Sequence, residues 1–331
     1  MAQKPYAVAV IGGDGIGPEV TAAALKVLAA TGVTFDFSHH DAGDACLEAT
    51  GKALPAETLK GALAAQAVLF GAVGRSAAEV ILRLRAELGT FVNLRPAKAY
   101  PGVPCLHPQT DMIIVRENTE GLYTGIEAAL TPEVVTTTRL ITAKASQRVA
   151  RYAFDLAKHM GRKRVTAVHK NNVLIKSDSL FLQECRQVAL EFPGIEYEEA
   201  LVDSVAMRMV MKPEQFDVMV TTNLFGDILS DLAAGLIGGL GQCPSANLGP
   251  EHALFEPVHG SAPDIAGKGL ANPTAAIFCA AMLLRHLGEA AMADKVEAAM
   301  EACLAAGQVT GDLGGKLSTD QAADAVIARL G

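Results

Sequence analysis

Short apolar runs alternate with helical stretches along the first 90 residues. The run Ala7–Ile11 ends at a glycine-rich turn, and the apolar side chains of residues 18–30 then recur at helical spacing. Because parallel strands need a crossover connection, usually a helix, repeated units of this kind predict an α/β layer fold. The same alternation recurs in the expected strands at 34–37 and 67–70 and the expected helices at 55–65 and 77–88.

The rest of the chain has a different pattern. Residues 112–115 and 134–141 are rich in β-formers and enclose a glycine-containing hairpin or arm around residues 124–132. No internal repeat or low-complexity linker is visible, so a domain boundary is expected in a segment that crosses between domains. Further strands are expected at 164–169 and 216–221, and helices at 143–159, 178–191, 273–287, 291–306 and 319–330.

The composition is that of a globular chain of 331 residues, with 50% apolar and 19% charged residues. A net charge of -8 argues against nonspecific nucleic-acid binding, and the longest basic run, Arg162-Lys163-Arg164, is short enough to be a solvated loop. The six cysteines are scattered without CxxC pairs, which favours small buried thiols in a reducing compartment. With no signal-peptide core after Met1 and no apolar span of membrane length, a soluble cytoplasmic protein is expected.

The segment Gly12-Gly13-Asp14-Gly15-Ile16-Gly17-Pro18 follows a strand and opens a helix. Such a turn can place an anion or a cofactor at a helix N-terminus, but it can equally be a tight turn that needs glycine. It does not match GxGxxG, so both interpretations stay open.

Asp227 and Asp231 are one helical turn apart among apolar neighbours. Two adjacent carboxylates repel each other unless a cation lies between them, and an all-oxygen site suits Mg²⁺ or Mn²⁺. The alternative is that Asp227 only caps its helix.

Arg85, Arg95 and Arg116 lie on or after different expected elements. If the three guanidinium groups converged, they would form a site for a polycarboxylate, because arginine pairs with carboxylates in a planar fork. Three unrelated surface arginines remain the alternative.

Taken together, these motifs resemble the family of metal-dependent decarboxylating dehydrogenases that includes isocitrate, isopropylmalate and homoisocitrate dehydrogenases. The resemblance covers almost the whole chain. Its carriers are residues 13–17, Asn93-Leu94-Arg95-Pro96, residues 115–121 (VRENTEG), His169-Lys170, residues 223–231 and the run 255–267 (FEPVHGSAPDIAG).

The resemblance implies an isopropylmalate dehydrogenase-like, non-Rossmann α/β fold with two domains and an active-site cleft between them, completed by a second subunit. Residues 1–90 and 238–331 would form the larger, cofactor-binding domain, and residues 91–237 an inserted smaller domain. The hairpin near residues 125–141 is similar in position to the arm that clasps the partner chain in family dimers. A homodimer or higher homo-oligomer with shared active sites is therefore expected.

The resemblance also implies residue roles, position by position. Tyr123 and Lys170 match the catalytic acid/base pair, with Lys170 supplied across the dimer interface. Asp203 matches the carboxylate that reaches the metal from the partner subunit, and Asp203 or Lys170 would accept the proton of the substrate hydroxyl. NAD is the expected cofactor, because a carboxylate at Asp264 accepts hydrogen bonds from ribose hydroxyls and repels a 2′-phosphate. The metal ligands would be Asp203, Asp227 and Asp231; the substrate residues Arg85, Arg95, Arg116, Tyr123, Lys170 and Leu82; and the cofactor residues His259, Gly260, Ser261, Ala262, Asp264, Ile265, Asn272, Asn118 and Asn172.

The expected reaction is NAD-dependent oxidative decarboxylation of a 2-hydroxy acid with a β-carboxylate. The segment before Arg85 lacks the Ser and Asn that isocitrate enzymes place at Glu79 and Ile81, whereas its apolar pair Ile81-Leu82 is typical of isopropylmalate enzymes. Residues 117–121 resemble isocitrate or homoisocitrate enzymes, and Leu122 before Tyr123 is more like the latter. Homoisocitrate, oxidised to 2-oxoadipate in the aminoadipate route of lysine biosynthesis, is therefore the predicted substrate. Isocitrate and isopropylmalate are the alternatives, and Glu79 conflicts with a distal carboxylate unless Arg75 or Arg83 neutralises it.

Two other classes of function are considered. A noncatalytic regulatory subunit should have lost catalytic residues, but Tyr123, Lys170, Asp203, Asp227 and Asp231 are all present. A nucleotide-binding protein without redox chemistry should bind NAD whether or not metal and acid are added.

Overall fold

The computed structural model describes residues 4–330, which divide into two compact units. The first comprises the chain up to Thr90, Tyr100–Pro108 and the chain from Ile237 onward; the second comprises Phe91–Ala99 and Gln109–Leu236. The segment Tyr100–Pro108 differs from the predicted division, which put it in the inserted domain. It lies with the first unit because the Tyr100 ring stacks on Phe278, with ring centroids 4.8 Å apart.

The first unit is built on strands whose inner members are buried, with the partly exposed β2 at one edge. They are ordered β2-β1-β3-β12-β11, with β1 parallel to both of its neighbours and β11 antiparallel to β12. All six residues of β3 are buried, as expected for a parallel strand covered on both faces. The strands are β1 (Tyr6–Gly13), β2 (Phe35–His40), β3 (Ala67–Ala72), β11 (Pro244–Leu248) and β12 (Ala253–Pro257).

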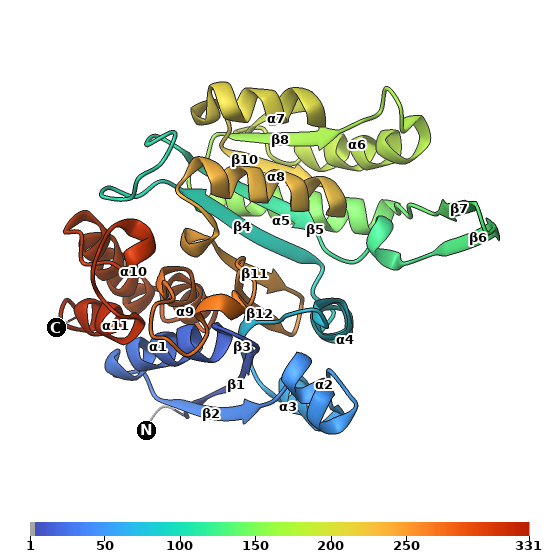
Figure 1. Cartoon of the computed structure of the whole chain (residues 1–331). Helices are drawn as coiled ribbons and strands as arrows, with labels where there is room; N and C mark the ends of the chain where they lie inside the picture. Colours follow the sequence, from blue (N-terminus) through green and yellow to red (C-terminus); the bar gives the residue numbers. More distant parts are fainter. Residues whose placement is uncertain (1–3, 331) are drawn as a thin grey trace. The chain divides into compact units, whose positions relative to one another are not determined.

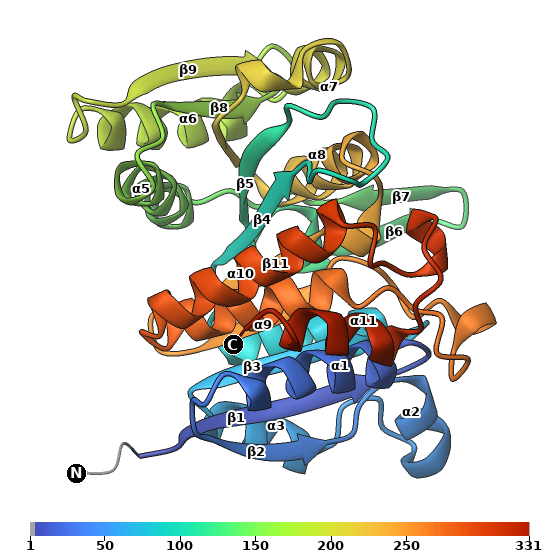
Figure 2. The same cartoon turned by 90° about the vertical axis from the view of Figure 1, so that its left-hand side faces the viewer.

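Helix α9 (Thr274–His286) forms the centre of the helical layer of this unit. Its apolar residues point in nearly all directions, which is typical of a helix buried on every side, and ten of its thirteen residues are buried. It packs against α1 and α10 (Figure 2). It also packs against β12. The helices of the unit are α1 (Gly17–Ala30), α2 (Asp44–Thr50), α3 (Ala56–Ala64), α4 (Arg83–Glu87), α9, α10 (Ala290–Ala305) and α11 (Thr319–Ile327), with short turns η1 (Ala78–Leu82), η4 (Leu240–Gln242), η5 (Pro263–Ile265) and η6 (Gly311–Leu313).

The second unit has its own strand order, β4-β5-β10-β8-β9. Strand β4 is antiparallel to β5, and the remaining neighbours are parallel. Its elements are β4 (Val92–Lys98), β5 (Asp111–Glu117), η2 (Leu122–Thr124), β6 (Glu127–Thr131), β7 (Val134–Thr137), α5 (Ala143–His159), β8 (Arg164–His169), α6 (Ile175–Ala189), β9 (Glu196–Leu201), α7 (Val202–Met211), η3 (Pro213–Gln215), β10 (Val218–Thr221) and α8 (Asn223–Leu236).

Strands β6 and β7 form a separate two-stranded ribbon, which we call the arm (residues 126–138). Figure 1 shows the arm extending away from the helices of the second unit. Every residue of both strands is exposed. Because an isolated two-stranded ribbon is marginally stable in water, this element is expected to need a further surface to pack against.

Candidate active site

Helix α8 presents Asp227 and Asp231 on one side, one turn apart. Asp231 has 61% of its side chain exposed, and its Oδ1 lies 3.5 Å from Nη1 of Arg95. Partial desolvation and the charge of Asp227 raise the pKa of Asp231 above its usual range. The pair is thus two carboxylates that disfavour each other's charge, with one of them open to a ligand.

Arg116 lies at the end of β5 and is only 1% exposed. Its Nη1 donates to Asp227, its Nη2 donates to Oδ1 of Asn223 at 2.8 Å, and its Nε donates to the Asn223 carbonyl at 3.0 Å. This close approach depends on Gly226, since a Cβ there would lie 2.6 Å from Cγ of Arg116. Arg116 is therefore fixed against the first turn of α8.

Arg95 reaches the same two carboxylates from β4. Its Nε donates to Oδ1 of Asn93 at 2.7 Å, and Nη1 donates to Oγ of Ser230 at 2.8 Å. Nη1 is also 3.7 Å from Asp227 Oδ1. Arg95 and Arg116 thus converge on the same two carboxylates, and two arginines with two aspartates give a cluster of zero net charge.

Tyr123 completes this cluster from the η2 turn. Its hydroxyl donates to Oδ2 of Asp227 at 2.5 Å, and the Arg116 guanidinium lies 5.0 Å from the ring centroid. Burial, and then the hydrogen bond to Asp227, raise the pKa of Tyr123. The hydroxyl therefore remains protonated at neutral pH.

Lys170 and Asp203 form a second pair, after β8 and in the first turn of α7. The Lys170 ammonium donates to Oδ1 of Asp203 at 2.7 Å, and this hydrogen bond lowers the pKa of Asp203. No hydrogen bond or ion pair joins Lys170 to Tyr123 among the described residues. Within residues 4–330 of one chain, three or more His, Cys, Asp or Glu side chains nowhere gather as a metal site, so Asp203 does not join Asp227 and Asp231 there.

Arg85 lies in the first unit, where it is paired with Glu256 of β12. Its Nη2 donates to Oε1 of Glu256 at 2.8 Å, and Nδ2 of Asn247 donates to the same oxygen at 2.7 Å. The Nε of Arg85 is buried and has no hydrogen-bond partner among the described residues. Arg85 is thus held in place by Glu256 while its buried Nε donor is still unused.

The segment before Arg85 is a π-helical turn, η1, that runs into α4. Leu82 lies three residues before Arg85 and is half-buried, whereas Glu79 is exposed and lies four residues before Arg83. Glu79 and Arg83 line a cavity of about 420 Å³ together with Lys52 and Leu54. Glu79 and Arg83 thus face this cavity, whereas Leu82 is not part of its lining.

The glycine-rich turn at residues 12–18 serves as a packing surface for the predicted cofactor loop. Gly15 has φ +58°, and a Cβ there would lie 1.9 Å from the Ser261 carbonyl, which accepts the Ile16 N–H at 2.8 Å. Asp14 accepts the N–H groups of Asp44 and Gly74 at 2.8 and 3.0 Å. The turn therefore holds neighbouring loops through tight backbone contacts, as the tight-turn interpretation predicts.

The loop His259 to Ile265 has two unusual features. Nε2 of His259 is buried without a hydrogen-bond partner among the described residues, and burial lowers the pKa of this histidine. Ala262 has φ +37°, a conformation that costs a non-glycine residue roughly 1–2 kcal/mol. After it, η5 exposes Asp264. An orphaned buried nitrogen and a strained turn are both typical of a ligand-binding loop.

The remaining predicted cofactor residues lie in both units. In the first unit, Nδ2 of Asn272 donates to Asp312 at 2.9 Å. Gly260 is exposed, and Ser261 and Ile265 are half-buried. In the second unit, Asn118 is buried after β5 and Asn172 is exposed after β8.

The sequence interpretation missed several residues that hold the predicted ones. Asn93 could have been found by strand alternation, because it lies two residues before Arg95 on the same face of β4. Asn223 lies one turn before Asp227 on α8. Glu256 and Asp312 carried no such local signal, since Arg85 and Asn272, their partners, are far from them in the sequence. The same holds for Glu19, which accepts the N–H of Ala271 and the hydroxyl of Thr319.

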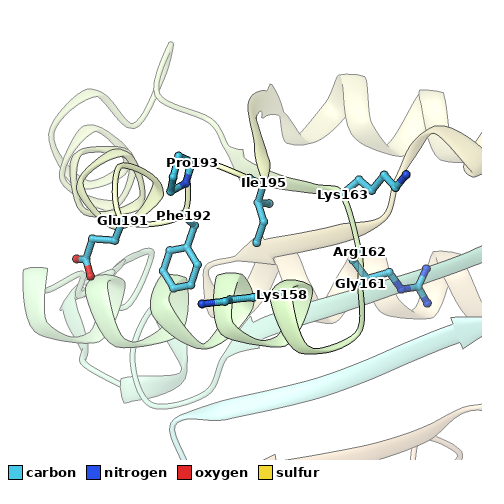
Figure 3. A pocket seen from close by; sticks show the side chains of 9 residues that line it. Lys158, Gly161, Arg162, Lys163, Glu191, Phe192, Pro193 and Ile195 are labelled. Atoms are coloured by element: carbon cyan, nitrogen blue, oxygen red, sulfur yellow. The ribbon is translucent and has the colours of Figure 1, made fainter.

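A cavity of about 670 Å³ in the second unit involves none of the predicted residues. Figure 3 shows Lys158 of α5, Lys163, Phe192 and Ile195 around it, where α5 ends and the chain enters β9.

The six cysteines are free, and five of them are buried. In the described part of the chain, no helix combines the length and apolar character needed to span a bilayer.

Comparison with known proteins gives a consistent result over the whole chain. The family profile described as "Isocitrate/isopropylmalate dehydrogenase" matches residues 7–326. The chain is 55% identical to the 3-isopropylmalate dehydrogenase of Archaeoglobus fulgidus, covering 98% of this chain and 99% of that protein. Two proteins of Methanocaldococcus jannaschii also match. The chain is 55% identical to a 3-isopropylmalate/3-methylmalate dehydrogenase, covering 98% of this chain and 99% of that protein. It is 44% identical to a homoisocitrate dehydrogenase, covering 97% of this chain and 96% of that protein.

A solved structure is similarly close. The crystal structure of isocitrate dehydrogenase from Methylococcus capsulatus superposes with a TM-score of 0.95 at 45% sequence identity, covering 98% of this chain and 99% of that chain. This match confirms the predicted α/β fold class, and the profile match confirms the predicted resemblance. The chain therefore belongs to the isocitrate/isopropylmalate dehydrogenase family and is an oxidoreductase.

Proposed function

We propose that this enzyme carries out the NAD-dependent oxidative decarboxylation of 3-isopropylmalate. The observation that carries the choice of substrate is the position of Leu82, an apolar, half-buried side chain three residues before Arg85 that is not part of the cavity lined by Glu79 and Arg83. An apolar substituent can lie against Leu82, whereas Arg85, the cation beside it, binds the malate-like part of the substrate in this proposal and is not left for the distal carboxylate of homoisocitrate. The greater identity to isopropylmalate enzymes supports the same choice, so it replaces the homoisocitrate prediction.

The cations suggested as neutralising Glu79 have other neighbours. Nε of Arg83 lies 3.8 Å from Glu87, and Nε of Arg75 lies 3.8 Å from Asp44. Neither arginine pairs with Glu79 among the described residues, so the Glu79 carboxylate near the specificity segment disfavours a second, distal carboxylate on the substrate.

A divalent cation fits the donor set of the second unit. Asp227 and Asp231 offer hard oxygen ligands, and Asp203, kept anionic by Lys170, is the third ligand, from a second copy of the chain. The zero net charge of the arginine–aspartate cluster remains balanced when a dication and a dicarboxylate bind together. When bound, Mg²⁺ or Mn²⁺ acidifies the substrate hydroxyl and stabilises charge on its oxygen, and NAD accepts the hydride.

The protein groups supply orientation and proton transfer. Arg85, Arg95 and Arg116 bind the carboxylates of the malate-like part of the substrate. The Lys170–Asp203 pair takes the hydroxyl proton, through water, as the hydride leaves. Tyr123, which its raised pKa keeps protonated, gives a proton to the carbon from which CO₂ departs.

A second copy of the chain is the proposed partner. Large apolar side chains are exposed on α7 (Met207, Met211), on α8 (Ile228) and on the arm (Leu130, Val135). These side chains lie on α7, which carries Asp203, on α8, which carries Asp231, and on the arm itself. A second chain that covers them would therefore complete the site and protect the arm.

A substrate comparison tests the proposed reaction. We expect kcat/KM for 3-isopropylmalate, with NAD and Mg²⁺, to exceed the values for isocitrate and homoisocitrate by at least about 100-fold, because a charged group against Leu82 loses its hydration. Glu79→Gln, which removes the neighbouring negative charge, should narrow the preference for 3-isopropylmalate but leave this ranking unchanged, because Leu82 is still present. A higher kcat/KM for homoisocitrate would contradict the assignment.

The coenzyme assignment has its own test. Replacing Asp264 by Lys together with Ile265→Tyr should shift the NADP/NAD ratio of kcat/KM by roughly tenfold or more, because one repulsive charge is removed and an attractive one added, each worth about 1 kcal/mol in water. Glu251→Lys, an exposed charge reversal in the same unit, should not shift the ratio. An unchanged ratio in the double variant would count against Asp264 as the selecting residue.

A further inference from the structure

Arg139 lies at the root of the arm, where the main chain is fixed on both sides. Just before it, the Thr138 N–H donates to the Ile126 carbonyl at 2.8 Å. Just after it, Leu140 exchanges two backbone hydrogen bonds with Gly121, at 2.9 and 3.2 Å. The position of Arg139 is therefore tied to the arm and to the turn that carries Tyr123.

The Arg139 guanidinium joins two other elements. Nη1 donates to the carboxylate of Asp178 in α6 and to Oγ of Ser177 at 2.9 Å. Nη2 donates to Oγ1 of Thr222, directly before α8, at 3.0 Å, and the guanidinium carbon lies 5.3 Å from the centroid of the Phe225 ring. One side chain thus contacts the starts of α6 and α8, which a shorter or unforked cation cannot do.

Asp178 connects this arginine to Lys170. Its side chain is 0% exposed, and its second oxygen, Oδ2, accepts the main-chain N–H of Lys170 at 2.6 Å. The Lys170 carbonyl in turn accepts the N–H of Leu174 at 2.8 Å, which fixes the loop between β8 and α6. A fully buried carboxylate needs such partners, so its two oxygens hold the Lys170 main chain and Arg139 at a set distance from each other.

We propose that Arg139 and Asp178 are positioning residues that hold Lys170 for proton transfer. The inference rests on the proposed role of Lys170. It assigns a function to the buried Arg139–Asp178 ion pair, which contacts neither the Lys170 ammonium nor the Tyr123 hydroxyl. Lysine has a long flexible side chain, so the direction of its ammonium depends on a fixed main chain. A displacement of about 1 Å at a reacting group can cost about 100-fold in rate.

The test uses Arg139→Lys, which keeps a cation beside Asp178 but cannot reach Asp178 and Thr222 together. We expect kcat to fall about 10- to 100-fold, with the substrate KM changed less than about threefold. The decisive measurement is a double-mutant cycle with Lys170→Met. In that background Arg139→Lys should change the residual kcat less than about twofold, because the group that it positions is already absent.

Arg162→Met is the matched control. Arg162 makes a comparable half-buried ion-pair network in the same unit, with Asp111 at 2.6 Å and Asp217 at 3.0 Å, but it does not contact the Lys170 loop. It should lower the melting temperature and leave kcat nearly unchanged. If Arg139→Lys lowers kcat equally in the presence and absence of Lys170, or matches the control, the positioning role is wrong.

The outcomes also separate this inference from the proposed function. Full activity of Lys170→Met would overturn the catalytic role of Lys170 and the inference with it. An inactive Lys170→Met enzyme together with an unchanged Arg139→Lys enzyme would overturn only the positioning role.

Discussion

Heterodimers that combine one Lys170→Met subunit with one Asp227→Asn subunit are expected to have about half the wild-type kcat, although each variant alone loses about 10²–10⁴-fold. If Lys170 acts on the substrate bound by the partner, one of the two sites in this heterodimer has an intact Asp227 and an intact Lys170. The other site has lost both. The measurement is kcat of heterodimers isolated by two different affinity tags.

The matched control combines Asp227→Asn with Asp231→Asn. Both changes affect α8, so each site of that heterodimer lacks one ligand and no recovery is expected. If the Lys170/Asp227 heterodimer is as inactive as this control, Lys170 acts within its own chain and the shared site is wrong.

Asp231→Asn is expected to lower the affinity for Mn²⁺ and the metal-dependent kcat/KM by at least about 100-fold, because it removes one ligand charge from a small set of carboxylates. Asp231 is a better choice than Asp227, which also accepts hydrogen bonds from Arg116 and Tyr123. The variant should therefore fold normally.

Thermal unfolding provides a readout of metal binding that is independent of turnover. A cation at 100 times its Kd stabilises the folded wild type by about 2.7 kcal/mol, and this increment should fall to about 0.4 kcal/mol or less in Asp231→Asn at the same Mn²⁺ concentration. Glu214→Gln, an exposed neutralisation in the same unit, should keep the increment. Wild-type Mn²⁺ stabilisation in Asp231→Asn would show that the cation binds elsewhere.

Much of the fold could be predicted because periodicity is a local property. The helix at Ala143–His159 and the strand at Arg164–His169 match the expected bounds. Strand β9 (Glu196–Leu201) was missed because its glutamates look like a solvated segment, and only its place beside β8 makes it a strand. The predicted helix at residues 77–88 begins with a π-helical turn, which no apolar spacing signals.

The candidate site was predictable in part for a similar reason. Asp227 and Asp231 lie on one helix, so their proximity follows from their spacing. The convergence of Arg95 and Arg116 depends on the pairing of β4 with β5, where Asn93 is directly opposite Arg116. Nothing in the sequence links Arg139 to Asp178, because that contact requires the arm root and α6 to meet in space.

The arginine pair of the second unit has a consequence for the thermodynamics of binding. Arg116 and Arg95 are only 1% and 9% exposed, and Asn223, Asn93 and Ser230 fix their rotamers. Free arginine side chains lose about 2 kcal/mol of conformational freedom when they are immobilised. Here that entropy is lost during folding, so a substrate carboxylate that binds as proposed would meet preorganised donors and keep more of its interaction energy as affinity.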